Sequence, residues 1–195
     1  DQKRPLQGAY PPACPWILQS GRYPSCRQSF LKTHHNTQII MDLYLVLQKL
    51  NIAYQEVEHP PVVTVAAAQA ILQRINGTGC KNLLLTDERK TRYLLVILEG
   101  SRRADLKAIA QLAKMSRLSF ASDADLHHLL GLTKGSVSPF GLLNDTCHRI
   151  CVMIDRTLAG KTLLFHPNIN TKTLAVSWSD LLRFIEFTHH SCLFL

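Results

Sequence analysis

The apolar residues of this chain change their spacing repeatedly between residues 41 and 187, and this irregular alternation constrains the fold most strongly. Helical spacing predicts helices at residues 41–50, 64–71, 106–113, 123–130 and 178–187. Extended patterns predict strands at residues 54–58, 80–86, 93–98, 118–120, 149–155, 162–166 and 174–176. Strands and helices are mixed without a regular βαβ repeat, so the sequence predicts a single α+β domain.

Capping residues mark where three of these helices begin. Asp105, Ser122 and Ser177 each precede a helical pattern, and their side chains can accept hydrogen bonds from the first free backbone N–H groups. Ser122 and Asp125 have the spacing of a capping box, with Asp in place of Glu or Gln.

Residues 1–40 lack such a pattern. This segment is rich in proline, and its remaining polar residues show no sustained period. We expect it to be a disordered or non-native N-terminal extension. The folded domain is expected over residues 41–188, followed by a short apolar C-terminal tail at residues 189–195.

Charge and composition limit the function classes. The formal net charge of +8 favours an anionic partner, with nucleic acid the first choice. No apolar run is long enough to span a bilayer, so we expect a cytoplasmic protein without membrane contact. None of the six cysteines forms a CxxC pair, which argues against a zinc ribbon and favours free thiols. Dinucleotide and P-loop signatures are absent from the sequence.

The segment 135–141, Gly-Ser-Val-Ser-Pro-Phe-Gly, has the composition of a ligand-binding loop. Glycine lets the backbone approach a ligand closely, and proline fixes φ. Ser136 and Ser138 add hydroxyls that suit hydrogen bonding better than nucleophilic attack, because no GxSxG motif is present. Two other polar clusters, Lys81-Asn82 and His166-Pro167-Asn168, accompany this loop and together indicate a site.

Each candidate side chain has two interpretations. Lys81 can reach a phosphate as a mobile charge or be a solvated surface lysine. His166 can act as a base or orient a substrate, or it can fix a strand end. Cys80 could be a nucleophile activated by the neighbouring lysine, but strand alternation places the two on opposite faces and favours core packing for the thiol. Arg102 and Arg103 could contact RNA phosphates or form a solvated helix start.

Three segments occur in an order that resembles a known superfamily. Gly79–Leu85 (GCKNLLL), Gly135–Gly141 (GSVSPFG) and Phe165–Asn168 (FHPN) are similar to motifs of the YbaK/prolyl-tRNA-synthetase insertion-domain superfamily. Arg102–Lys107 and Leu118–Ser122 strengthen the match. Within this superfamily the chain looks most like the freestanding prolyl-tRNA editing proteins, over about residues 41–186.

The resemblance implies an α+β domain with a mixed, partly barrel-like sheet flanked by helices. It also implies hydrolysis of mischarged aminoacyl-tRNA, chiefly alanine wrongly attached to tRNA(Pro). The implied partner is the acceptor end of mischarged tRNA(Pro), with prolyl-tRNA synthetase as a candidate second partner. No metal or organic cofactor is implied.

The resemblance also assigns roles to residues. Lys81, Gly135 and His166 are implied in catalysis, with Lys81 near the terminal adenosine or its phosphate and His166 near the aminoacyl group. The implied substrate-binding residues are Asn82, Ser136, Val137, Ser138, Pro139, Phe140 and Asn168. An ester on a ribose is already activated, so positioning, backbone donors and the free ribose hydroxyl could suffice for water attack.

Three alternatives stay open at this point. A deacylase of the same fold could act on Cys- or Ser-charged tRNA instead. The chain could also be a non-catalytic tRNA-binding or regulatory module. A cysteine hydrolase using Cys80 is the third alternative.

Overall fold

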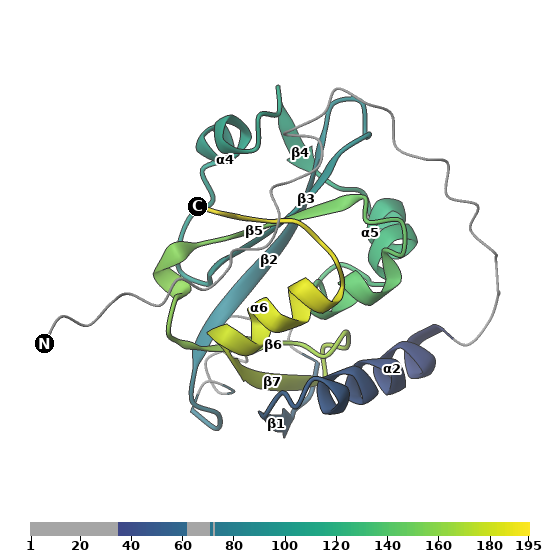
Figure 1. The fold of residues 1–195 in the computed structure, drawn as a ribbon, viewed down its shortest axis with the longest axis vertical. Helices are drawn as coiled ribbons and strands as arrows, with labels where there is room; N and C mark the ends of the chain where they lie inside the picture. Colours follow the sequence, from purple (N-terminus) through teal and green to yellow (C-terminus); the bar gives the residue numbers. More distant parts are fainter. Residues whose placement is uncertain (1–34, 62–70, 72) are drawn as a thin grey trace, which may run out of the picture.

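The structure, a computed structural model, describes residues 35–61, 71 and 73–195 (Figure 1). The expected N-terminal extension lies largely outside these residues, and so does most of the helix expected at residues 64–71. The first described helix, α2, begins at His35, which is earlier than the helix start expected at residue 41.

The described elements follow one another in mixed order. The helices are α2 (His35–Lys49), α4 (Leu106–Leu112), α5 (Asp123–Leu130) and α6 (Trp178–Phe187), with short 3-10 helices η1 (Pro139–Asn144) and η2 (Arg156–Leu158). The strands are β1 (Tyr54–Glu58), β2 (Thr78–Asp87), β3 (Tyr93–Glu99), β4 (Leu118–Phe120), β5 (Ile150–Ile154), β6 (Thr162–Phe165), β7 (Lys172–Ser177) and β8 (Cys192–Phe194).

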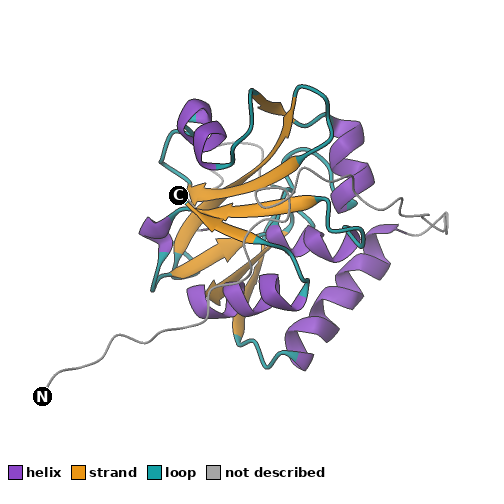
Figure 2. Ribbon diagram, turned by 45° about the horizontal axis from the view of Figure 1, so that its top comes forward, coloured by secondary structure: helices purple, strands orange, loops and turns teal. Residues whose placement is uncertain are grey.

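The strands form one eight-stranded mixed sheet in the order β1-β7-β6-β2-β3-β5-β8, and β4 pairs with β2. The pairs β2–β6, β3–β5 and β5–β8 are parallel, and the remaining pairs are antiparallel. Helices lie around this sheet (Figure 2). The predicted α+β class with a mixed sheet is confirmed.

Strand β2 connects the two halves of the sheet. It pairs with β3 along most of its length, whereas its other edge pairs with β6 only at Thr78 and Gly79 and with β4 only from Leu85 to Asp87. Between these two stretches, around Asn82, no other strand of the described chain lies beside this edge. We call this part the open edge of β2.

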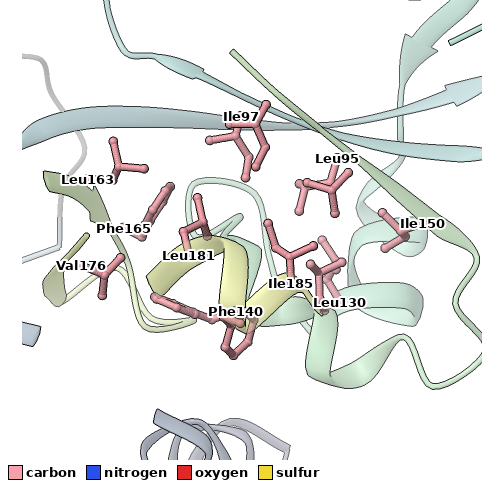
Figure 3. Close-up of a cluster of buried hydrophobic side chains, with 14 of the residues drawn as sticks. Leu95, Ile97, Leu130, Phe140, Ile150, Leu163, Phe165, Val176, Leu181 and Ile185 are labelled. Atoms are coloured by element: carbon pink, nitrogen blue, oxygen red, sulfur yellow. The ribbon is translucent and has the colours of Figure 1, made fainter. Parts of the chain in front are cut away.

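Two apolar clusters cover the two faces of the sheet. The larger one contains Leu84 of β2 together with buried residues of α2, α5, η1 and α6. The smaller one contains Leu85 and packs against α4. Figure 3 shows the larger cluster, with Leu181 and Ile185 of α6 near Ile97 and Leu95 of β3. Adjacent residues of β2 therefore face opposite clusters, as strand alternation requires.

The predicted caps are confirmed. Asp105 accepts hydrogen bonds from the backbone N–H groups of Lys107 and Ala108 at the start of α4. Ser122 and Asp125 form the reciprocal capping box of α5. Ser177 caps α6 by accepting a hydrogen bond from the Asp180 backbone N–H.

Residues 189–195, expected as a C-terminal tail, include a strand of the sheet. Residues Cys192–Phe194 form β8, which pairs in parallel with β5. His190 is buried and its Nε2 lies 3.3 Å from Oδ2 of Asp145. A three-residue strand is too short to show a period, and its pairing partner is distant in sequence, so the local pattern does not reveal it.

The expectation of free thiols holds for two cysteines. Cys80 and Cys192 are free. Cys147 and Cys151, in contrast, take part in disulfide bonding. Among the described helices, none combines the length and the apolar character needed to cross a membrane.

Candidate active site

A cavity of about 650 Å³ lies at the open edge of β2. Its walls come from β2, the end of β6, the start of α5 and the loop that precedes η1. Of the residues predicted for the site, it brings together Lys81, Asn82, Gly135, Val137 and His166. Segments far apart in the sequence therefore meet around one cavity, as the three motifs predict.

Lys81 is half-buried in the cavity wall. Among the described residues, no hydrogen bond or ion pair engages its ammonium group. Lys161 and Lys172, in contrast, form ion pairs with Glu99 and Glu56. A half-buried ammonium without a carboxylate partner is suited to bind an anionic ligand.

Asn82 joins the strand to the loop. Its side-chain Nδ2 donates a hydrogen bond of 2.9 Å to the carbonyl oxygen of Val137. Its Oδ1 is buried and has no hydrogen-bond partner in the described chain. The amide therefore fixes the position of the loop against β2, which is an indirect way of shaping a binding site.

Several backbone N–H groups of the loop have no hydrogen-bond partner within the described chain. Gly135 has a φ of 90°, a left-handed conformation that glycine adopts without strain. The N–H groups of Gly135 and Val137 make no hydrogen bond within the described chain, whereas Ser136 N donates to the Thr133 carbonyl. Free amides beside a cavity can stabilise negative charge on a bound ligand.

Four predicted substrate-binding residues of this segment do not line the cavity. Ser136 donates through Oγ to the Thr133 carbonyl at 2.9 Å, and Ser138 caps η1. Pro139 and Phe140 are buried, and the Phe140 ring packs edge-on against Phe184. Core packing and loop bonds occupy these side chains, and their contact with a substrate stays a prediction.

His166 lies where β6 ends, and its Nδ1 donates a hydrogen bond of 2.8 Å to the Lys172 carbonyl. Burial lowers the pKa of His166 below its usual value of 6.5. The ring is therefore neutral near pH 7, with the proton on Nδ1 and a lone pair on Nε2.

A second histidine supports this ring. His59 lies with its ring centroid 5.8 Å from that of His166. Its Nδ1 donates to the Pro60 carbonyl, and its Nε2 accepts a hydrogen bond from the Thr173 hydroxyl, each at 2.9 Å. Thr173 also lines the cavity. These contacts fix the His59 ring within the fold.

Three further predicted residues lie away from the cavity lining. Asn168 is buried with a φ of 64°, a conformation that Asn tolerates, and it shapes the turn after His166. Arg102 forms an ion pair with the buried carboxylate of Asp155, so its positive charge is neutralised within the domain. Arg103 is exposed and not part of the cavity wall.

Cys80 lines the cavity but is poorly suited to attack a substrate. Burial raises the pKa of its thiol to about 12, and its Sγ lies 3.5 Å from the Thr78 carbonyl. A thiol with this pKa is almost entirely protonated at neutral pH, so it is a weak nucleophile. The side chain packs against the larger apolar cluster, as strand alternation predicts.

The sequence did not single out several cavity residues, namely Phe120, Asp123, Leu126, Lys134 and Thr173. They lie on β4, α5, β7 and the start of the loop. Phe120 belongs to the Leu118–Ser122 segment that strengthens the family resemblance, and Lys134 directly precedes the glycine loop, but neither signal assigns a role in the site. Among the described residues, no group of three His, Cys, Asp or Glu side chains could hold a metal ion.

Comparisons with known proteins show the family of the chain. Residues 59–184 match the model of the aminoacyl-tRNA editing domain family. The chain is 36% identical over 141 residues to the prolyl-tRNA editing protein ProX of Acetoanaerobium sticklandii, covering 72% of this chain and 86% of that protein. It is 33% identical over 148 residues to prolyl-tRNA synthetase associated domain-containing protein 1 of Danio rerio, covering 74% and 80%.

A solved structure shares the fold. The solved protein, described as a candidate trans-editing enzyme for prolyl tRNA synthetase, superposes on this chain with a TM-score of 0.62 at 19% identity. The match covers 80% of this chain and 96% of that chain. At this identity the likeness concerns the fold alone.

Proposed function

Because the chain belongs to the aminoacyl-tRNA editing domain family, it is an aminoacyl-tRNA hydrolase, and we propose that it removes alanine from mischarged tRNA(Pro) in trans. The observation that carries this proposal is the meeting of Lys81, the Gly135–Val137 loop and His166 around one cavity. The similarity to a prolyl-tRNA editing protein supports prolyl-tRNA as the substrate class.

The reaction is hydrolysis of the ester between the amino acid and the terminal ribose. Water adds to the carbonyl carbon, the bond to the ribose oxygen breaks, and that oxygen takes a proton. The neighbouring ribose hydroxyl helps to activate the water, so the protein needs no covalent nucleophile. The high pKa of the Cys80 thiol is consistent with this route.

The loop stabilises the charge that develops on the ester oxygen. The N–H groups of Gly135 and Val137 have no internal partner and lie beside the cavity, so they can donate to an oxyanion. The Asn82 bond to the Val137 carbonyl holds these donors in place. The ammonium of Lys81 binds the phosphate of the terminal nucleotide.

His166 positions the aminoacyl group. Its Nε2 lone pair accepts a hydrogen bond from the α-ammonium of the bound amino acid, since Nδ1 is already committed to the Lys172 carbonyl. Leu84, Leu126 and Phe165 provide an apolar wall for a small side chain. Discrimination between alanine and proline then depends on the size of the side chain. In an apolar pocket, one methylene changes kcat/KM by roughly 10- to 200-fold.

The test is hydrolysis by the purified full chain of tRNA(Pro) charged with alanine, proline, cysteine or serine in separate reactions. Rapid release of alanine, with proline retained, is the expected result. Preferential release of cysteine or serine would retain the site but replace the substrate. Binding of tRNA without any hydrolysis would overturn the proposed activity in favour of a binding module.

A further inference from the structure

Phe120 is a large aromatic side chain that the core does not use. It is 62% exposed, although it lies on a strand, and it forms part of the cavity wall. The neighbouring strand residue Leu118, in contrast, is buried in the smaller apolar cluster. An exposed ring at the wall of a cavity is available to contact a bound ligand with its face.

Strand register places Phe120 on the same face of the sheet as Lys81. Leu83 and Leu85 belong to the cluster on the α4 face. Alternation along β2 therefore points Lys81 to that face as well. Phe120 lies directly opposite Leu85, and residues opposite each other in paired strands share a face.

The cavity therefore extends around the open edge of β2 and has two sides. Leu84, Leu126 and Phe165 line the side of the larger cluster. Lys81, Leu83 and Phe120 line the side of α4. A ligand bound across the open edge would place one end on an apolar wall and the other between a cation and an aromatic ring.

We propose that the Phe120 ring stacks on the terminal adenine of the tRNA acceptor end. This inference rests on the proposed function, in which the ester at the open edge carries the amino acid on one side and the nucleoside on the other. The terminal nucleotide of a tRNA is unpaired, so both faces of its base are free to stack on an aromatic side chain.

The charges that line the cavity suit the phosphates and leave the Phe120 ring to the uncharged base. Lys81 and Lys134 are cations that suit the phosphates, and Asp123 adds one carboxylate to the same cavity. Phe120 is therefore a binding residue for the base, whereas Lys81 serves the phosphate.

The experiment compares Phe120→Ala, Phe120→Leu and Phe120→Trp with the unaltered full chain. The control is Leu112→Ala, which removes another exposed large apolar side chain, from α4, outside the cavity lining. Two quantities are measured: kcat and KM for Ala-tRNA(Pro), and the fluorescence of 2-aminopurine placed at the terminal position of uncharged tRNA(Pro).

Phe120→Ala and Phe120→Leu should raise KM by roughly 5- to 150-fold, the range that corresponds to loss of one stacked base, and should leave kcat nearly unchanged. Both variants should also lose the quenching of 2-aminopurine on binding. Phe120→Trp should retain both properties, and Leu112→Ala should match the unaltered protein. The Leu variant separates loss of the ring from loss of apolar surface.

Equal KM and equal quenching in Phe120→Ala and the unaltered protein would overturn the inference. If no aminoacyl-tRNA is hydrolysed but quenching still depends on the ring, the base-binding role stands and the proposed reaction fails. If the chain hydrolyses aminoacyl-tRNA and the Phe120 variants are as active as the unaltered protein, the proposed reaction stands and the base-binding role fails. The two proposals can therefore fail independently.

Discussion

The side-chain amide of Asn82 donates a hydrogen bond of 2.9 Å to the carbonyl of Val137, and this bond holds the glycine loop against strand β2. The two residues are 55 positions apart in the sequence. Asn82 therefore sets the distance between strand β2 and the amides of the loop.

Asn82→Asp should lower kcat/KM for Ala-tRNA(Pro), because a carboxylate cannot donate to the Val137 carbonyl and leaves a partly buried acceptor unpaired. We expect a loss of roughly 10- to 100-fold, corresponding to a misplaced loop donor. Steady-state kinetics with the charged tRNA measures it. A variant with unaltered kinetics would show that the bond does not position the loop.

Lys81→Ala should lower kcat/KM by about 100- to 1000-fold while the protein stays folded, since the ammonium has no internal carboxylate partner to lose. Lys107→Ala, which removes an exposed lysine of α4 outside the cavity, is the matched control. Circular dichroism with thermal unfolding checks the fold of both variants. Retained turnover in Lys81→Ala would rule out the assigned role.

The acid limb of the kcat/KM profile should lie below pH 6.5. Burial lowers the pKa of His166 from that value, so the ring keeps its Nε2 lone pair as the pH falls through 6.5 and loses it only at lower pH. His166→Asn should abolish this limb, and His128→Ala, on the exposed surface of α5, should leave it unchanged. A limb that survives in His166→Asn would assign the titration to another group.

Alkylating reagents should not inactivate the enzyme through Cys80. With the thiol pKa raised to about 12 by burial, almost no thiolate is present at neutral pH. Cys80→Ala should retain most of the activity, as measured with Ala-tRNA(Pro). Complete loss of activity in Cys80→Ala, with the fold intact, would revive the cysteine hydrolase alternative.

Phe140→Ala should affect stability rather than substrate binding. The side chain is 1% exposed and packs edge-on against Phe165 and Phe184, so its removal should cost about 3–5 kcal/mol of unfolding free energy. Urea unfolding measures this cost. The KM of the folded fraction should stay unchanged, and a raised KM at full folding would return Phe140 to the substrate site.

Much of the fold follows from local patterns. The capping box of Ser122 and Asp125 and the apolar run at β3 are short-range features, so spacing alone locates them. Strand β8 is different, because three residues carry no period and their stability comes from pairing with β5. The order of strands in the sheet likewise depends on contacts between distant residues, which no local pattern contains.

The site divides in the same way. Lys81, Gly135 and His166 stand in recognisable motifs, and the structure places them around one cavity. Phe140 stands in the same motif yet faces the core, because a loop that approaches a ligand with its backbone must anchor its own side chains elsewhere. Phe120 could not be singled out, since its exposure depends on where β4 ends along β2.

The parallel pairing of β2 with β6 brings Gly79 beside Leu164, two residues that are distant along the chain. Joining two distant segments lowers the conformational entropy of the chain between them, and contacts between residues closer in sequence must first offset this cost. We therefore expect β2 and β6 to pair late in folding. A nascent chain that has emerged only as far as β5 lacks His166 and one wall of the cavity. The site of an enzyme that corrects errors of translation is therefore incomplete until β6 and the histidine that follows it have themselves been translated.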